Sequence, residues 1–156
     1  MDRIAQELKI HQLANHKNVI QYKGHFFDTE GNLCIKLEKM TKTLETRIGE
    51  EAKTGEHFPE WKLWFYFIQL VRGVYYLNMA NIIHMDIKAD NILINDKTKE
   101  LKLSDFGTSK KFEEGDPSIC LPGTGLATPL TASPEMLSGK GFGRRNDTWA
   151  LGCILY

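Results

Sequence analysis

Hydrophobic residues recur along the chain with two different periods, and these periods predict its elements. Apolar residues at roughly helical spacing, separated by charged ones, predict a helix within about the first dozen residues. Two strand-like runs, VIQYKGHFF and LCIKLE, flank DTEGN, whose acidic and glycine residues favour a hairpin turn. The chain is therefore predicted to begin with a helix and an antiparallel pair of strands.

A longer helix is predicted from Pro59 to about Met79. Proline suits a first helical position, and large apolar side chains form a wide face along this segment. This face contains Trp61, Trp64, Phe65, Ile68, Val71 and Tyr75. So many large aromatic residues predict a helix deep inside a helical subdomain, with core packing favoured over a cofactor site.

The second half of the chain combines short strands, a long loop and a final helix. The runs NILIN and LKLS predict two strands joined by a polar turn around DKTKE. From Asp105 to Glu135 the sequence is rich in Gly, Pro, Ser and Thr, and a loop this long is usually functional or disordered. The final DTWALGCILY predicts the opening of an apolar helix, so we expect a truncated domain.

Composition restricts the class of protein without identifying it. The 156 residues suit one domain, and 20 basic residues balance 20 acidic ones, which argues against a nucleic-acid or anionic-membrane partner. The first ten residues do not resemble a signal peptide, and the longest apolar-rich stretch is interrupted by polar and charged residues. Cys34, Cys120 and Cys153 lack metal-ligand spacing. We expect a cytoplasmic chain without a membrane segment, or the cytosolic part of a larger membrane-anchored protein.

The segment IIHMDIKADNILIN, followed by LKLSDFG, carries the candidate chemistry. Asn91 precedes one predicted strand and Asp105 follows the next, so an antiparallel hairpin returns these side chains to the same place. An amide oxygen beside a carboxylate suits Mg²⁺, which prefers hard oxygen ligands together with water and phosphate. Asp86 is then free to accept a proton from an attacking hydroxyl, and Lys88 could neutralise a phosphoryl group.

This segment resembles the catalytic loop H-R-D-x-K-x-x-N and the D-F-G motif of protein kinases. ATPLTASPEML resembles the G-T-P-x-Y-x-A-P-E segment that ends the kinase activation loop, and DTWALG resembles D-x-W-S-x-G in the helix anchoring the lower lobe. Upstream, Glu7 stands nine residues before His16 in HKNVI, as the upper-lobe glutamate stands before H-P-N-I-V. The resemblance covers essentially the whole chain.

The resemblance implies a serine/threonine protein kinase that uses ATP and Mg²⁺ and acts on serine or threonine in protein substrates. It implies an α+β, bilobal kinase-like fold, truncated, with about 1–40 as a partial upper lobe and hinge and about 41–156 as an incomplete, mainly helical lower lobe. The implied site residues are Asp86 and Lys88 for catalysis; Asn91 and Asp105 for metal; Glu7, Glu38, Met40 and Leu93 for ATP; and His84, Phe106, Gly107, Thr128, Glu135 and Asp147 for structure and regulation.

Several implied roles concern contacts between segments. Leu37 would be the gatekeeper before the adenine-binding backbone of 38–40, and Leu93 would lie under the adenine ring. His84 and Phe106 would stack in the active arrangement, while Thr128 would bridge Lys88 and Asp86. Asp147 would hold the catalytic-loop backbone, and Glu135 would pair with an arginine beyond Tyr156.

Departures from the kinase pattern concern regulation and substrate choice. Met85 replaces an arginine that clamps a phosphorylated activation-loop residue, so we expect activation not to depend on that clamp. Hydroxyls that could still carry phosphate are those of Thr108, Ser109, Ser118, Thr124 and Thr128. The groove residues Ala127, Thr131 and Ala132 and the spine position His11 also depart from the usual residues, so substrate preference is not carried over.

Two functions from different classes stay open. The presence of Asp86, Lys88, Asn91 and Asp105 favours the kinase. A non-catalytic kinase-like binding or regulatory module is favoured by Met85, Thr131, His11 and the absent upper-lobe segments. Because no glycine-rich loop or strand lysine precedes the Glu7 helix, we expect this fragment alone to be unstable and inactive. EKMTKTLETRI, SDFGTSKKF, PEML and ALGCILY faintly resemble the unfolded-protein sensor and the kinases of translation initiation factor 2 alpha, which suggests a kinase-domain dimer.

Overall fold

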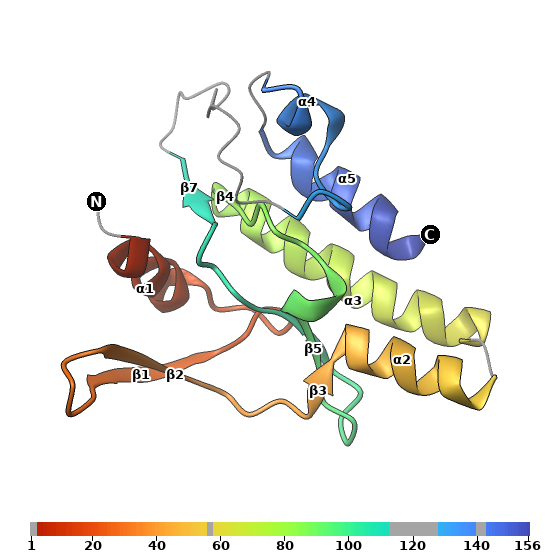
Figure 1. The fold of residues 1–156 in the computed structure, drawn as a ribbon, viewed down its shortest axis with the longest axis horizontal. Coiled ribbons are helices and arrows are strands. Elements are labelled where there is room, and N and C mark those ends of the chain that lie inside the picture. Colours follow the sequence, from red (N-terminus) through yellow and green to blue (C-terminus); the bar gives the residue numbers. More distant parts are fainter. Residues whose placement is uncertain (1–2, 56–57, 113–127, 140–142) are drawn as a thin grey trace.

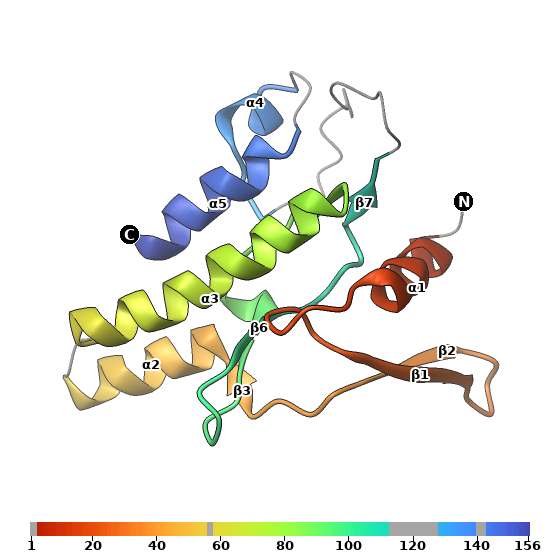
Figure 2. The same ribbon diagram turned by 180° about the vertical axis from the view of Figure 1, so that it is seen from behind.

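The computed structural model describes residues 3–55, 58–112, 128–139 and 143–156. In chain order the elements are α1 (Arg3–Leu13), β1 (Tyr22–Phe27), β2 (Leu33–Leu37), β3 (Lys42–Thr43), α2 (Leu44–Thr54), α3 (Glu60–Met79), β4 (Ile82–Ile83), the 3-10 turn η1 (Ala89–Asn91), β5 (Ile92–Ile94), β6 (Leu101–Leu103), β7 (Lys110–Lys111), α4 (Pro134–Leu137) and α5 (Arg145–Leu155). Helix α1 and the β1–β2 hairpin lie on one side of β5 and β6, and helices α2, α3 and α5 lie on the other (Figures 1 and 2). The predicted α+β fold class is confirmed.

The predicted hairpin between the first two strands is present. Strands β1 and β2 pair antiparallel, with Tyr22 opposite Leu37 and Phe27 opposite Leu33. The turn closes because the Asp28 carboxylate accepts the backbone N–H groups of Glu30 and Asn32, as acidic turn residues commonly do. The hairpin carries the chain from α1 to the segment that leads into β3.

A three-stranded sheet, in the order β3–β5–β6, forms the centre of the fold. Strands β5 and β6 pair antiparallel with Ile92 opposite Leu103, as the two predicted short strands require. The segment after α1 joins this sheet, because Leu103 donates its N–H to the Asn18 carbonyl and accepts from the Ile20 N–H. This pairing fixes α1 relative to the hairpin that carries the candidate chemistry.

The main hydrophobic core lies between this sheet, α1 and α3. Its largest fully buried side chains are Ile10, Ile20, Leu70, Leu77, Ile82, Ile87, Ile92, Ile94, Leu101 and Phe106. Helix α3 approaches the sheet closely at Gly73, where an added Cβ would lie 2.7 Å from the Asn18 carbonyl oxygen. Glycine is required there by space rather than by backbone conformation.

A buried amide pair fastens α3 to the end of β6. The Gln69 side-chain oxygen accepts from the Leu101 N–H at 3.0 Å and from the Asn18 side-chain amide at 3.2 Å. The Asn18 amide also donates to the Leu101 carbonyl at 2.9 Å. These bonds satisfy polar groups that would otherwise be costly to bury, so they fix the register of helix against sheet.

The prediction that the aromatic face of α3 is deeply buried is wrong within the described residues. Trp61 is 69% exposed and Tyr75 is 65% exposed, while Trp64, Phe65, Ile68 and Val71 are 38–47% exposed. The opposite face, with Leu70, Val74 and Leu77, packs in the core. Pro59 is the N-cap rather than the first helical residue. None of the described helices combines the length and apolar character needed to cross a membrane.

Helix α2 was not predicted from the sequence, although both of its ends carry capping signals. The Thr43 hydroxyl accepts the Thr46 N–H at 3.0 Å, and Gly55 ends the helix with a φ of 71°. A threonine N-cap and a left-handed glycine are common helix boundaries. The apolar residues of α2, Leu44, Ile48 and Ala52, do recur at helical spacing, but they are few beside the long aromatic-rich face of α3.

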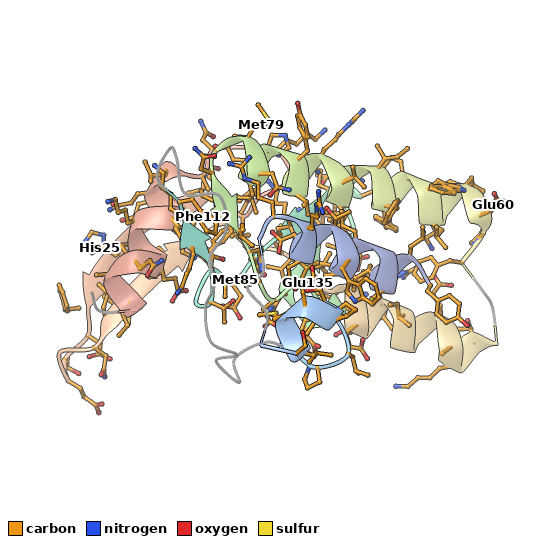
Figure 3. The ribbon with its side chains drawn as sticks, turned by 90° about the horizontal axis from the view of Figure 1, so that it is seen from above. His25, Glu60, Met79, Met85, Phe112 and Glu135 are labelled. Carbon is orange, nitrogen blue, oxygen red and sulfur yellow. The ribbon has the colours of Figure 1, made fainter. Side chains whose placement is uncertain are left out.

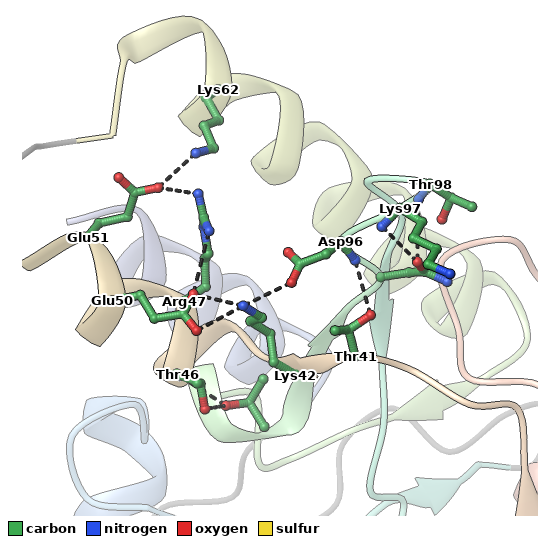
Figure 4. A network of polar contacts seen from close by, with 12 residues as sticks. Thr41, Lys42, Thr46, Arg47, Glu50, Glu51, Lys62, Asp96, Lys97 and Thr98 are labelled. Atoms are coloured by element: carbon green, nitrogen blue, oxygen red, sulfur yellow. Dashed lines mark hydrogen bonds and ion pairs between the residues drawn. The ribbon is translucent and has the colours of Figure 1, made fainter. Parts of the chain in front are cut away.

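Charged side chains connect α2 to the sheet and to α3 (Figure 4). Lys42 lies 2.8 Å from both Glu50 of α2 and Asp96 of the β5–β6 turn. Lys62 of α3 donates to Glu51 at 2.8 Å. Partly exposed pairs add little free energy individually, so this network mainly fixes how the three elements meet.

Candidate active site

The connection from β4 to β5 carries the candidate catalytic residues, and α5 holds its backbone. The Asp147 carboxylate accepts the N–H of His84 at 2.8 Å and the N–H of Met85 at 3.0 Å. Complete burial raises the pKa of Asp147, although these donors and the nearby His84 offset part of the rise. Met85 has a φ of 71°, a left-handed conformation that the two bonds to Asp147 help to hold.

Asp86 lies at the centre of four hydrogen-bond donors. Its Oδ1 atom accepts the Thr128 hydroxyl at 2.8 Å and the Thr128 N–H at 3.3 Å. Its Oδ2 atom lies 3.0 Å from Lys88 Nζ and accepts the Asn91 side-chain amide at 2.9 Å. Lys88 also donates to the Thr128 hydroxyl at 3.1 Å, so Thr128 bridges Lys88 and Asp86.

These donors set the ionisation of the pair formed by Asp86 and Lys88. Burial alone would raise the pKa of Asp86, but the bonds from Lys88 and Thr128 outweigh it, and the pKa lies below its ordinary value. The bond to Asp86 raises the pKa of Lys88 against the opposing effect of its own burial. Asp86 is therefore a carboxylate and Lys88 an ammonium group over the physiological pH range.

The β5–β6 hairpin brings Asn91 next to the residue that precedes Asp105. The Ser104 N–H and hydroxyl both donate to the Asn91 carbonyl, at 2.9 and 3.0 Å. The Asn91 side-chain amide is held by Asp86, while its side-chain oxygen accepts no bond from another described residue. The strand pairing thus places Asn91 beside Ser104, and a shared metal site of Asn91 and Asp105 stays a prediction.

Asp105 and Glu7 flank Gly107. Asp105 is exposed, has a φ of 66° and accepts the Gly107 N–H at 3.1 Å. A Cβ added at Gly107 would lie 3.2 Å from Asp105 Oδ1 and 3.6 Å from Glu7 Oε2. Helix α1 therefore directs the Glu7 carboxylate toward the turn that carries Asp105.

A cluster of three rings, in edge-on and tilted contact, joins α1 to the β4–β5 connection. The His11 ring meets the Phe106 ring edge-on, with ring centroids 4.9 Å apart. The His84 ring is tilted against Phe106, with ring centroids 5.4 Å apart. His84 Nε2 lies 3.0 Å from the Ser104 carbonyl, and its Nδ1 accepts the Asp86 N–H at 3.4 Å. His11 is buried, and the polar residue at this spine position packs edge-on against Phe106.

Two of the expected phosphate sites have structural roles instead. The hydroxyls of Thr108 and Ser109 both donate to the His84 carbonyl at 3.1 Å, and Ser109 is only 3% exposed. Burial makes Ser109 inaccessible in this conformation, whereas a phosphate on the half-buried Thr108 stays a prediction. The Thr128 hydroxyl is bonded to Asp86, and Ser118 and Thr124 lie outside the described residues.

The residues expected to bind adenine lie at the end of β2 and in β5. The Glu38 side chain points away from the hinge backbone, since it accepts from the Gln21 N–H at 2.7 Å and from Lys102 at 2.9 Å. The Met40 N–H makes no hydrogen bond to another described residue. The Glu38 N–H, in contrast, donates to the Gln21 carbonyl at 3.0 Å. Leu93 is half-buried in β5, opposite Thr43.

A groove of about 640 Å³ opens beside Lys88 and Thr128. Asp90, Leu130 and Trp149 line it, and none of these three was singled out from the sequence. Asp90 lies two residues after Lys88 and directly before Asn91, and this position between two predicted site residues is the signal that could have identified it.

Glu135 lies in the first turn of α4 and forms no ion pair with another described residue, so its predicted pairing with an arginine stays a prediction.

Across residues 3–55, 58–112, 128–139 and 143–156, no group of three or more His, Cys, Asp or Glu side chains is placed to hold a metal ion. The predicted Mg²⁺ site of Asn91 and Asp105 is of a different kind, because it would combine one amide and one carboxylate with oxygen ligands from phosphate and water.

Comparison with known proteins agrees with this geometry. Residues 1–156 match the family model of the protein kinase domain. The chain is 35% identical over 158 residues to serine/threonine-protein kinase PLK2 of Mus musculus, covering 99% of this chain and 22% of that protein. It is 33% identical over 156 residues to serine/threonine-protein kinase polo of Drosophila melanogaster, covering 99% and 26%.

A third relative is mitogen-activated protein kinase kinase kinase 3 of Homo sapiens, with 37% identity over 158 residues, 97% of this chain and 24% of that protein. The chain thus spans about a quarter of the length of these curated relatives. The fainter likeness to stress-responsive kinases stays a prediction. The match of residues 1–156 to the family model shows that the chain belongs to the protein kinase domain family.

Proposed function

We propose that the protein containing this chain transfers the γ-phosphoryl group of ATP to serine or threonine hydroxyls of protein substrates. The observation that carries this proposal is the Asp86 carboxylate, held by Lys88, Asn91 and Thr128 beside a groove about 640 Å³ in volume. Phosphoryl transfer depends mainly on positioning and on stabilising charge, which is what such a rigid arrangement supplies.

The donor set fits Mg²⁺ and ATP. The side-chain oxygen of Asn91 accepts no bond from another described residue, and the Asp105 carboxylate is exposed and accepts only the Gly107 N–H within the described chain. Asn91 and Asp105 would hold the metal, Leu93 and the backbone of 38–40 would contact adenine, and the bound nucleotide would supply the phosphoryl group. Glu7 and Asp105, two carboxylates flanking Gly107, favour a cation nearby.

Asp86 is proposed to orient the substrate hydroxyl and to accept its proton. Its lowered pKa makes it a weak base, which suits a reaction in which the proton leaves late and positioning matters most. Lys88, 3.0 Å from Asp86, would place a positive charge beside the transferred group. Thr128 would keep both side chains in register through its bonds to each.

The alternative is a non-catalytic kinase-like binding or regulatory module. Its support is the environment of Glu7. Within the described chain the ion-pair partner of Glu7 is His11, with Nε2 lying 3.8 Å from Glu7 Oε1, and not a lysine. For the same reason we propose that these 156 residues are inactive by themselves. A cytoplasmic location and a kinase-domain dimer stay predictions.

The test is transfer of radioactive phosphate from γ-labelled ATP to serine- and threonine-containing proteins by the full-length protein containing this chain. We expect Asp86→Asn and Asp105→Asn to abolish transfer, and Asp28→Asn, in the β1–β2 turn, to leave it unchanged as a matched control. Folded protein without any transfer, but with retained nucleotide or partner binding, would establish the binding module instead.

A further inference from the structure

A second apolar cluster lies beneath the catalytic loop, separate from the main core. We call it the Met85 cluster; its buried members are Ile83, Met85, Phe112, Ala132 and Met136. Met85 is only 4% exposed although it belongs to a loop rich in polar side chains. Figure 3 shows Met85 and Phe112 near each other, with Phe112 at the end of β7. No member of this cluster is charged, so contacts within it are apolar.

The cluster gathers the two described ends of one long segment. The chain enters the segment at Phe112, whose N–H donates to the Asn81 carbonyl at 2.8 Å. It returns at Ala132 and at Met136 of α4, which are 6% exposed. Met85 belongs to the same cluster of buried residues as both of these ends.

This packing is connected to the catalytic carboxylate on two sides. Met85 is the neighbour of Asp86 in sequence, and its N–H is fixed by Asp147 at 3.0 Å. On the other side, the Ala132 N–H donates to the Thr128 carbonyl at 3.1 Å, and the Thr128 hydroxyl reaches Asp86 at 2.8 Å. A displacement of Ala132 relative to Met85 would therefore displace Thr128 relative to Asp86.

We propose that Met85 is a positioning residue that aligns Thr128 with Asp86 by anchoring Phe112 and Met136 through apolar contacts, without any phosphate on the intervening segment. This inference rests on the proposed kinase function. Methionine suits the role because its flexible thioether fills irregular gaps between neighbours from several elements. None of the five side chains of the cluster is cationic, whereas Lys110 and Lys111 of β7 pair with β4 directly beside it, so the phosphatase experiment below decides whether a phosphate contributes.

Kinase assays of the full-length protein test the alignment. We expect Met85→Ala to lower kcat/KM for the protein substrate by on the order of 10- to 100-fold, because small misplacements of reacting groups are costly. The KM for ATP should change less than about twofold, because Met85 lies outside the groups proposed to hold the nucleotide. Met85→Leu, which conserves volume, should recover activity to within about threefold.

A matched control separates alignment from general loss of stability. Leu77→Ala truncates a fully buried side chain of α3, away from the Met85 cluster. Assayed at a temperature where both variants are folded, it should keep kcat/KM within about threefold of the unsubstituted protein. An equal loss in Leu77→Ala and Met85→Ala would overturn the positioning role.

Two further measurements test the anchor independently of the mutant kinetics. Hydrogen exchange at the amides of Thr131 and Ala132, which both donate to the Thr128 carbonyl, should accelerate in Met85→Ala but not in Leu77→Ala. Phosphatase treatment of the unsubstituted protein should leave the exchange unchanged and turnover within about twofold. Unchanged exchange in Met85→Ala, or a large loss after phosphatase, would overturn the proposal. Absence of turnover in all samples would refute the kinase function alone, and the exchange experiment would still decide the anchor.

Discussion

The side-chain amide of Asn91 donates to both the backbone carbonyl and the Oδ2 atom of Asp86, at 2.9 Å in each case. The orientation of this amide is thereby fixed, with the nitrogen toward Asp86. Its oxygen accepts no bond from another described residue and is available to a metal ion. One side chain can thus fix the proposed base and provide a ligand for Mg²⁺.

We expect Asn91→Ala to lower kcat by on the order of 100-fold, because Asp86 loses a positioning donor and the metal loses a ligand. The Mg²⁺ concentration that gives half-maximal turnover should rise as well. The measurement is steady-state phosphate transfer over a range of Mg²⁺ concentrations. Asn95→Ala, in the β5–β6 turn, is the matched control and should retain turnover; an unchanged Mg²⁺ dependence in Asn91→Ala would contradict the metal-binding role.

Thr128→Ala should raise the pKa of Asp86. In the unsubstituted protein the bonds from Lys88 and Thr128 outweigh burial and keep this pKa below its ordinary value of 3.8. Removing the hydroxyl weakens that effect, so the pKa moves upward. Thr128→Ser keeps the hydroxyl and should keep the low pKa. Carbon-13 NMR titration of the Asp86 carboxyl group measures the shift directly; equal titration curves for Thr128→Ala and Thr128→Ser would argue against this role of the hydroxyl.

The same shift gives the sign of the pH dependence. Because the pKa of Asp86 is depressed in the folded state, its contribution to stability is present above the unfolded pKa of about 3.9 and is lost as pH falls through the folded value. Thr128→Ala should lose part of this contribution. Its unfolding free energy should therefore differ from that of Thr128→Ser above about pH 4 and converge with it at lower pH.

Asp147→Asn should destabilise the fold and lower activity together. Both carboxylate oxygens accept backbone N–H groups, from His84 and Met85, whereas an amide would direct its NH₂ at one of these donors. Leaving a buried donor unpaired costs about 1–3 kcal/mol. Chemical denaturation measures this loss. Asp147→Glu is the comparison variant, because it keeps the carboxylate and changes only the length of the side chain. No loss of stability in Asp147→Asn would contradict the importance of these two bonds.

Gly73→Ala should destabilise the protein by about 1–3 kcal/mol, because the new Cβ would lie 2.7 Å from the Asn18 carbonyl oxygen and force α3 from the sheet. Gly49→Ala in α2 is the matched control. No heavy atom lies within 4 Å of a Cβ at Gly49, so higher helix propensity should stabilise it by about 1 kcal/mol. Thermal unfolding of both variants checks the opposite signs, and stabilisation by Gly73→Ala would contradict the close approach.

The sequence predicted those elements whose periodicity or turn chemistry is strong. Helix α3, the β1–β2 hairpin and the β5–β6 hairpin lie within a few residues of the predicted positions. Helix α2 was missed because its boundaries, Thr43 and Gly55, are single-residue signals and only three apolar residues mark its periodic face. The exposure of Trp61 and Tyr75 could not be predicted, because periodicity identifies an apolar face and not the element that covers it.

The site shows the same division between local and tertiary information. The pairing that brings Asn91 next to Ser104, the neighbour of Asp105, could be predicted, because the antiparallel hairpin requires it. The use of the Thr108 and Ser109 hydroxyls by the His84 carbonyl could not, since it depends on how β7 approaches β4. For Met85 the sequence indicated only a lost charge, and its burial required the fold.

Met85 and Asp105 lie close in sequence to Asp86 and Phe106, and both have positive φ values, 71° and 66°. Such conformations cost non-glycine residues on the order of 1–3 kcal/mol each and persist only where surrounding structure imposes them. Substitutions that weaken those surroundings should therefore disturb the catalytic loop before they unfold the core. Among natural variants, we expect loss of activity to be commoner than loss of folded protein, so that inactive descendants of such a domain can remain well folded and be recruited for binding.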